Sequence, residues 1–319
     1  MDRRTLLKGL PLGAAALVGG GLGWRQLKVR READLWLDPL ENRSESDDPP
    51  IIDPLRDEGS HAARPEMGPG TGDLGVTGSS GEVDPNQKTR DFDRTYADDF
   101  LLSADQQVVL ESVAARIERA QKLVGHGNFN LLSFDRLIRF AENYQDIGSF
   151  TKEELTFLED IFWADAKWYG FMGDKVITEL TGEIARRDVE KIKGSGHYLF
   201  RGEPLEKFER IQRDIGETIA LTSGVRGLAK QYQLFLSKAV ETVGNLSQAS
   251  RSLAPPGYSY HARGDFDIGK VGMGPENFTE AFASTDEYRK MIDLGYVDIR
   301  YHEANPFGVR HEPWHIKIA

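Results

Sequence analysis

Two histidines near the end of the chain stand beside carboxylates in a set that zinc hydrolases use. His261 lies in the segment PGYSYHARGDFDIG, which also contains Asp265 and Asp267, and His315 lies in HEPWHIKI, where Glu312 precedes it. Catalytic zinc takes three protein ligands and keeps a further position for water, whose pKa it lowers to about 7, and it polarises the scissile carbonyl. These residues therefore predict a Zn2+ site for metal-assisted hydrolysis.

Glu312 is the carboxylate that could remain free of the metal and act as general base. It would take a proton from the attacking water and return it to the leaving amine. In a regular strand Glu312 and His315 would face opposite sides, so a shared site requires a break between them. Pro313 offers that break, because proline cannot donate to a strand ladder and is confined to edges and bulges.

Either acid of the segment DFD could complete the metal site. In a strand Asp265 and Asp267 face the same side, whereas Phe266 faces the other side and is expected to enter the core. The alternation alone leaves both aspartates open as the third ligand.

A second candidate for substrate contact is the segment Ser223-Gly224-Val225-Arg226. It lies where a predicted strand meets a predicted helix. Backbone N–H groups and a guanidinium can converge on an anion at such a junction. We therefore expect Arg226 to meet negative charge on a substrate.

Together these motifs resemble the zinc D-alanyl-D-alanine carboxypeptidases and dipeptidases of the vancomycin-resistance type, which have a Hedgehog-like fold. The resemblance rests on S-x-H-x-x-G from Ser259 and on E-P-W-H from Glu312, and it spans about 203–318. It implies that His261, Asp267 and His315 bind zinc. It also implies that Glu312 is the catalytic base.

The resemblance assigns substrate contacts as well. It implies that Arg226 holds the substrate or its developing charge, that Gln231 matches a downstream glutamine of the family, and that Ser259 lies near the substrate. The family spacing from its first histidine to its aspartate is one residue longer than here and would fall on Ile268, which cannot bind zinc. Asp267 remains the preferred ligand, because Ile268-Gly269 continues the family pattern, and Asp265 is the alternative.

The function that the resemblance implies is hydrolysis of the terminal D-Ala-D-Ala bond of peptidoglycan stem peptides. An L,D-carboxypeptidase or a wall endopeptidase with the same zinc site is the first alternative. A non-catalytic cell-wall-binding protein, with a metal site spoiled by the shortened loop, is the second. Four other histidines are expected to be structural or solvated: His61, His126, His197 and His302. His311, which adjoins Glu312, is expected to be structural as well, and the alternative is that it donates a hydrogen bond beside Glu312.

The elements that must position these residues are helical first and mixed afterwards. Capping boxes at Ser103 and Thr151 predict helix starts. Further helices are expected over the ranges 157–163, 168–180, 181–192, 205–214, 228–243 and 286–294. Strands are expected over the ranges 217–222, 265–268, 298–301 and 314–318. The fold class is therefore α+β, with a small antiparallel sheet and flanking helices after an all-helical region.

Composition places limits on partners and compartment. The net charge of −11 argues against a nucleic-acid partner, and the lack of cysteine excludes disulfides and thiolate zinc sites. The start DRRTLLK followed by a Gly/Ala-rich apolar stretch resembles a twin-arginine export signal. We expect export to the periplasm or cell envelope, with the signal either cleaved or kept as an N-terminal membrane tether.

Four segments follow from these patterns. Residues 1–24 are the signal or anchor, 25–99 a disordered linker, 100–193 a helical region of unknown role and 194–319 the zinc carboxypeptidase domain. The linker is assigned because Pro, Gly, Ser and acidic residues leave too few apolar side chains to offset the entropy of ordering.

Overall fold

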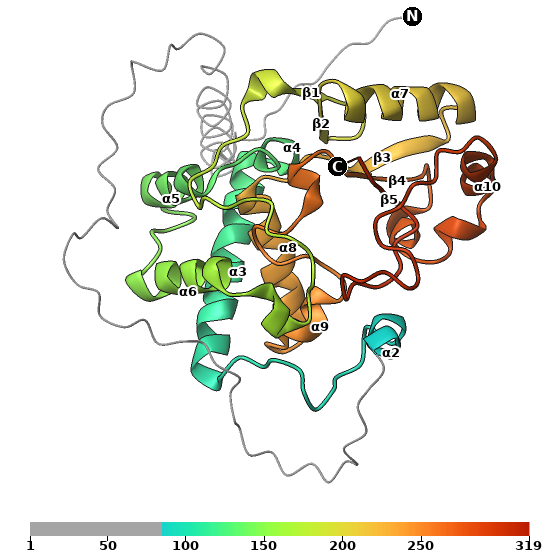
Figure 1. Cartoon of the computed structure of the whole chain (residues 1–319). Helices are drawn as coiled ribbons and strands as arrows, with labels where there is room; N and C mark the ends of the chain where they lie inside the picture. The colour runs from blue at the N-terminus through green and yellow to red at the C-terminus, as the bar shows by residue number, and fades with distance from the viewer. Residues whose placement is uncertain (1–84, 319) are drawn as a thin grey trace, which may run out of the picture.

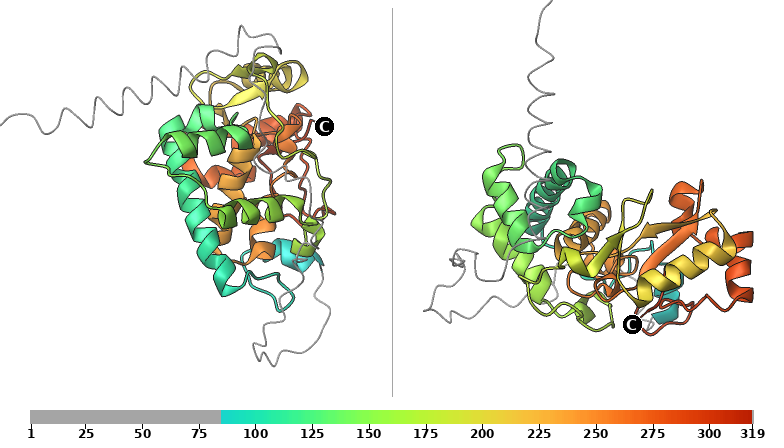
Figure 2. Two further views of the ribbon diagram at one scale, coloured as in Figure 1. Left: turned by 90° about the vertical axis from the view of Figure 1, so that its left-hand side faces the viewer. Right: turned by 90° about the horizontal axis from the view of Figure 1, so that it is seen from above.

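A helical half and a sheet half make up the computed structural model, which describes residues 85–318. In Figure 1 the helical half lies to the left and the sheet, with its two covering helices, to the upper right. The view from above in Figure 2 separates the same two halves. The predicted α+β class with a small antiparallel sheet is confirmed.

Capped helices build the helical half. Ser103 caps α3 (Ala104–Val124) and Thr151 caps α6 (Lys152–Trp163), each through the reciprocal bonds of a capping box. Both starts were predicted from the sequence. The shorter helices α4 (His126–Phe129) and α5 (Phe134–Asn143) lie between them in the chain.

The region after α6 corrects two predicted helices. The ranges 168–180 and 181–192 contain only the short turns η2 (Ala166–Tyr169) and η3 (Arg186–Asp188), followed by β1 (Val189–Lys191). Gly170 ends η2 with a φ of 80°, a left-handed conformation that glycine adopts without strain. β1 then pairs antiparallel with β2 (Tyr198–Phe200).

The central sheet carries the residues of the predicted site. Its order is β3 (Ile219–Ser223), β4 (Phe266–Lys270) and β5 (His315–Ile316), all antiparallel. The helices α7 (Glu203–Ile215) and α10 (Asp286–Asp293) pack on it through a core around Phe208, Phe266 and Met291. The predicted strand at 298–301 is reduced to one bridge, Ile299 with Ile316. The short helical turns η5 (Gly274–Phe278) and η6 (Phe282–Ser284) lie between β4 and α10 in the chain.

One hydrophobic cluster crosses the predicted domain boundary at 193/194. Residues of α8 (Leu228–Glu241) and α9 (Leu246–Ser250), including Tyr232 and Phe235, are buried in the same cluster as Ile117 and Phe162 of the helical region. The strand pair β1–β2 also crosses this boundary. The helical region therefore forms the surface on which α8 packs, and α8 in turn lines the site.

Residues 85–99 correct the end of the predicted linker. They contain α2 (Pro85–Arg90) and a turn fixed by Asp99, whose carboxylate oxygens accept two bonds from the Arg251 guanidinium, at 2.8 and 3.1 Å. The same guanidinium donates to the carbonyl oxygens of Phe92 and Arg94. These buried polar contacts, which local composition does not reveal, order the segment.

The predicted signal and most of the predicted linker lie outside the described residues. Within residues 85–318, no helix is both long enough and apolar enough to cross a membrane.

Candidate active site

The sheet and the loop before β4 bring His261, Asp267 and His315 together. His261 lies in the turn η4 (Tyr260–Ala262), and Asp267 and His315 face each other as a register pair of β4 and β5. Asp267 Oδ1 lies 3.3 Å from His261 Nε2 and 3.2 Å from His315 Nδ1. One ligand atom from each residue lies within 4.8 Å of the others, and all three residues are buried.

These atoms fit a divalent metal ion. His261 Nε2 and Asp267 Oδ1 are buried without any hydrogen-bond partner, and such orphaned polar atoms are costly unless a ligand satisfies them. Two imidazoles and one carboxylate form a donor set that suits zinc. Among the described residues this is also the group of His, Asp and Glu whose geometry could hold a metal.

Hydrogen bonds fix the orientation of both imidazoles. His261 Nδ1 lies 2.8 Å from the carbonyl oxygen of Gly224. His315 Nε2 lies 3.0 Å from Asp265 Oδ2, and Arg300 Nε donates to the same carboxylate oxygen at 2.5 Å. Each imidazole is thereby held by the nitrogen that does not face Asp267.

The two acids of DFD therefore have different positions. Phe266 is fully buried in the core, as the strand alternation predicted, and both aspartates contact His315. Asp267 belongs to the metal-binding group, whereas Asp265 lies behind His315 and also accepts the backbone N–H of Ile318. The geometry thus favours Asp267 over Asp265 as a ligand.

Glu312 enters the site from a turn. The N–H of His315 donates to the carbonyl oxygen of Glu312 at 3.1 Å, so the chain breaks from strand geometry across Pro313 as the sequence predicted. Glu312 Oε2 lies 3.6 Å from His315 Nδ1. Burial raises the pKa of Glu312 to about 7, against the opposing effect of His315 and Arg310. A carboxyl with a pKa near neutrality suits general acid–base catalysis.

The two imidazoles differ in their proton affinity. Burial and the nearby Arg226 lower the pKa of His261 to about 4. Burial also opposes protonation of His315, but its hydrogen bond to Asp265 and the adjacent carboxylate of Asp267 outweigh this and raise its pKa to about 9. Without a metal, His261 is thus neutral at pH 7 and His315 is protonated.

Arg226 is engaged with the site itself. Its Nη2 donates to Asp267 Oδ2 at 2.5 Å and its Nε donates to Ser223 Oγ at 2.8 Å. The side chain lines the cavity over the metal-binding group, as Ser259 also does. Gln231 is not among the lining residues: its amide donates to the carbonyl oxygen of Ala254, so the expected contact of Gln231 with substrate is not supported.

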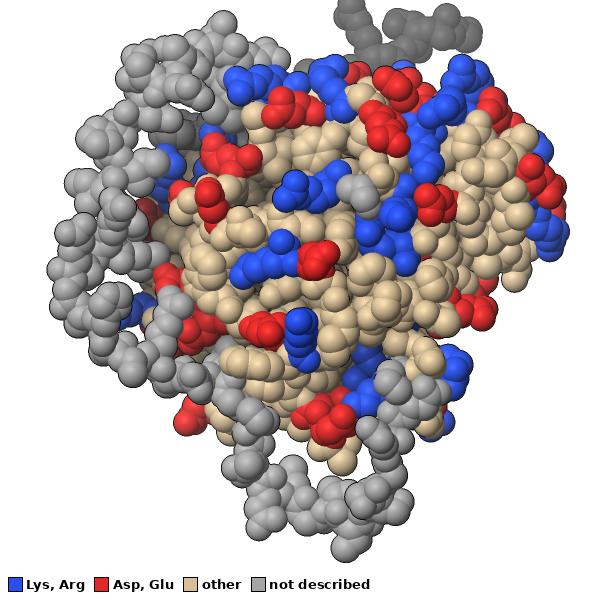
Figure 3. All heavy atoms as spheres, viewed as in Figure 1, with Lys and Arg blue, Asp and Glu red and all other residues tan. Residues whose placement is uncertain are grey.

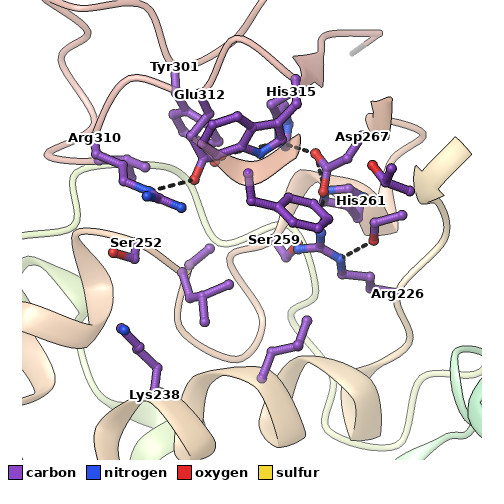
Figure 4. A pocket seen from close by; sticks show the side chains of 18 of the residues that line it. Arg226, Lys238, Ser252, Ser259, His261, Asp267, Tyr301, Arg310, Glu312 and His315 are labelled. Atoms are coloured by element: carbon purple, nitrogen blue, oxygen red, sulfur yellow. Dashed lines mark hydrogen bonds and ion pairs between the residues drawn. The ribbon is translucent and has the colours of Figure 1, made fainter. Parts of the chain in front are cut away.

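A cavity of about 410 Å³ opens over this group. Figure 4 shows His261, Asp267, His315 and Glu312 along one side of it, with Arg226 close to Asp267. Several of its lining residues were not singled out as site residues from the sequence: His197, Lys230, Lys238, Ser252, Tyr301 and Arg310. None lies in a recognisable motif, so only the fold identifies them.

Two of these residues correct or extend the sequence analysis. His197 was expected to be structural, but it lines the cavity, and burial with nearby Arg226 lowers its pKa to about 4. Tyr301 also lines the cavity, with its ring centroid 4.8 Å from that of His315. By contrast, His311 bonds to Glu280 at 2.8 Å and lies outside this cavity, so it is no donor at the base.

Charges on the visible surface are mixed. On the face shown in Figure 3, basic and acidic side chains alternate over the described residues, and no continuous basic area covers that face.

Known proteins resemble the part of the chain that carries this site. Residues 202–318 match the family described as D-alanyl-D-alanine carboxypeptidase, VanY. No curated protein matches the chain. The LdcB LD-carboxypeptidase structure is 23% identical with a TM-score of 0.34, and the match covers 40% of this chain and 62% of that one, less than two thirds of its length.

Two further solved structures are similar at the same level. The zinc(II) complex of the D,D-pentapeptidase VanY from a VanB-type resistance cassette is 23% identical, with a TM-score of 0.33 over 44% of this chain and 85% of that one. VanYB in complex with D-alanine-D-alanine is 23% identical, with a TM-score of 0.34 over 44% and 83%. The family match shows that residues 202–318 of this chain are similar to the D-alanyl-D-alanine carboxypeptidase family VanY.

Proposed function

We propose that the protein is a zinc metallopeptidase that removes the terminal D-alanine from peptidoglycan stem peptides. The observation that carries the proposal is the juxtaposition of His261 Nε2, Asp267 Oδ1 and His315 Nδ1 with the buried carboxyl of Glu312. The family of residues 202–318 supports the peptidase class and the peptide substrate.

The metal would be held by His261, Asp267 and His315. A zinc ion there supplies positive charge that polarises a carbonyl and lowers the pKa of a water molecule. Asp265 holds the His315 ring through Nε2, and the carbonyl oxygen of Gly224 holds the His261 ring through Nδ1. The rings are therefore oriented before any ligand binds.

Glu312 is proposed to move the proton. Its carboxylate lies beside the metal-binding group and lines the cavity, so it can accept a proton from a water molecule there. The protonated carboxyl can then donate to the amine of the departing residue. Burial of Glu312 keeps bulk water from competing for this proton.

Arg226 is proposed to stabilise charge over the same group. Two of its nitrogens are engaged by Asp267 and Ser223, which leaves Nη1 to face negative charge that develops on the substrate. Ser259, which also lines the cavity, is proposed as a substrate contact.

A L,D-carboxypeptidase or an endopeptidase would use the same residues. Incubation of the zinc-loaded protein with defined tetra- and pentapeptide muropeptides separates them by product mass. We expect loss of a single D-alanine from pentapeptide, with no loss from tetrapeptide. Glu312→Ala should retain stoichiometric zinc and lose turnover by several orders of magnitude, and His261→Ala should lose the metal. A native protein without zinc, or cleavage unaffected by Glu312→Ala, would reject the proposal.

Export is proposed from the N-terminal sequence alone. A peptidase with this substrate must act outside the cytoplasmic membrane, which agrees with the twin-arginine-type start of the chain. Fractionation of cells that express the full chain, with and without Arg3→Lys and Arg4→Lys, tests this.

A further inference from the structure

Arg310 is the cavity guanidinium that has no carboxylate hydrogen-bonded to it. Its Nε is buried and has no hydrogen-bond partner. The nearest acid is Glu312, whose Oε1 lies 3.9 Å from that nitrogen, beyond hydrogen-bond distance. Arg226 differs, because Asp267 and Ser223 engage its Nη2 and Nε. Arg310 is therefore the cation better able to accept an anionic group of a substrate.

The position of Arg310 is fixed by stacking. Its guanidinium carbon lies 4.6 Å from the ring centroid of Phe92 and 5.0 Å from that of Trp314. Its backbone N–H donates to the carbonyl oxygen of Arg251 at 2.9 Å. Planar stacking holds the guanidinium without using its N–H donors, so little rotamer entropy remains to be lost when an anion binds.

Ser252 provides a second unpaired donor nearby. Its Oγ is buried, has no hydrogen-bond partner and belongs to a residue that lines the cavity. Ser252 follows Arg251, whose carbonyl oxygen holds the backbone of Arg310. Figure 4 shows Ser252 on the same side of the cavity as Arg310, away from Arg226. Two unsatisfied buried polar groups in one wall are rare unless a ligand completes them.

We propose that Arg310 and Ser252 form a carboxylate-binding subsite that holds a carboxylate of the substrate beside Glu312. The proposal rests on the function proposed above and specifies how the substrate is recognised. A guanidinium fork and a hydroxyl donor are complementary to a carboxylate.

Two carboxylates of a stem peptide could reach this subsite. The terminal carboxylate is two bonds from the amine that Glu312 protonates, so a cation next to Glu312 is well placed for it. A side-chain carboxylate, such as that of a diaminopimelate residue, is the other source. The chemistry is shared, and peptides that lack one carboxylate at a time distinguish the sources.

The test compares three peptides on the zinc-loaded protein. The first is a diaminopimelate pentapeptide with a free C-terminus, the second is its C-terminal amide, and the third has lysine in place of diaminopimelate. The variants are Arg310→Gln, Arg310→Lys and Ser252→Ala. Lys238→Gln is the matched control, because Lys238 lines the same cavity but is already paired with Glu241 at 2.8 Å.

Wild type should cleave the peptide that lacks the recognised carboxylate with a kcat/KM about 10- to 100-fold lower. This ratio corresponds to the usual contribution of a hydrogen bond to a charged group. Arg310→Gln should remove that preference, Ser252→Ala should reduce it, and Arg310→Lys should restore part of it, mainly through KM. Lys238→Gln should keep the preference. If Arg310→Gln lowered kcat/KM by the same factor on all three peptides, the subsite would be rejected. Arg310 would then act through Glu312 or through folding, and not by binding a carboxylate.

Binding supplies an independent measurement. Calorimetry with Glu312→Gln, alone and combined with Arg310→Gln, should show the same dependence on the recognised carboxylate without turnover. If wild type cleaves none of the peptides but binding depends on Arg310, the proposed function fails and the subsite stands. If binding is indifferent to Arg310 for every peptide, the subsite is rejected.

Discussion

Asp265 Oδ2 lies 3.0 Å from Nε2 of His315, on the side of the ring opposite to Asp267. Asp267 of β4 and Asp265, which directly precedes β4, therefore meet the two nitrogens of one imidazole. Asp265 also receives two N–H donors from the Arg300 guanidinium and the backbone N–H of Ile318, so its carboxylate is fully engaged. These contacts favour a role for Asp265 in orienting His315 rather than in binding a metal.

Substitution of Asp265 should weaken metal binding while leaving the ligands in place. Asp265→Asn keeps an acceptor for His315 but loses the charge that opposes Arg300. Outer partners of this kind typically contribute 10- to 100-fold to metal affinity. We expect zinc affinity to fall by about that factor, measured by competition with a chromophoric chelator.

Two further variants serve as comparisons for the zinc affinity of Asp265→Asn. Asp267→Asn should reduce affinity further than Asp265→Asn, because it alters a ligand. Asp293→Asn, at the exposed end of α10, should have no effect. Stronger metal loss in Asp265→Asn than in Asp267→Asn would show that the roles of the two aspartates are reversed.

The sequence predicted the site more completely than the elements that enclose it. Short sequence motifs contain His261, Glu312 and His315, and the residue types in these motifs indicate metal chemistry even when the fold is not known. The choice between Asp265 and Asp267 was open because strand alternation places both on one side. In the structure, Arg300 and the C-terminal backbone contact Asp265 from distant parts of the chain, and this geometry favours Asp267 as the ligand.

The wrong predictions have two physical origins, one local and one long-range. The ranges 168–180 and 181–192 were predicted as helices, but Gly170 ends η2, and η3 ends before Val189, where β1 begins. The linker prediction failed at 85–99 because Asp99 and Arg251, far apart in the chain, form a buried pair. Arg310 and Ser252 were missed for the same reason, since only the fold places them in one cavity wall.

Zinc binding should release a proton from His315. Its pKa of about 9 in the metal-free protein means that Nδ1 carries a proton at pH 7, and a metal ligand must give that proton up. We expect apparent zinc affinity to rise by up to tenfold per pH unit toward pH 9. Calorimetry at pH 8 in buffers of different ionisation enthalpy should report about one proton released. A pH-independent affinity between pH 7 and 9 would contradict the assignment.

Glu312 should destabilise the metal-free protein at high pH. Its folded pKa of about 7 exceeds the ordinary value of 4.5, so the folded state binds its proton more tightly than the unfolded state does. The resulting stability is fully present below pH 4.5 and is lost as pH rises through 7, by about 3 kcal/mol. Glu312→Gln should abolish this loss. The measurement is urea unfolding after zinc removal. The variant should be more stable than wild type at pH 8 and equally stable at pH 4. Equal stability of the two proteins at both pH values would refute the raised pKa of Glu312.

Asp99→Ala should release residues 85–99 from the fold and with them the Phe92 ring that stacks on Arg310. Asp99 is fully buried at its side chain, and removing one partner of a buried pair typically costs 3–5 kcal/mol because Arg251 is left uncompensated. Burial alone would raise the pKa of Asp99, but its bonds to Arg251 and Asn245 outweigh this and lower it. The stability that Asp99 contributes is therefore present above pH 4 and is lost as pH falls, so wild type and variant should become equally stable at acid pH.

Asp98→Ala is the control, since Asp98 is exposed and pairs with Lys88 only at the surface. A variant that loses less than 1 kcal/mol at pH 7 would show that Asp99 does not anchor this segment.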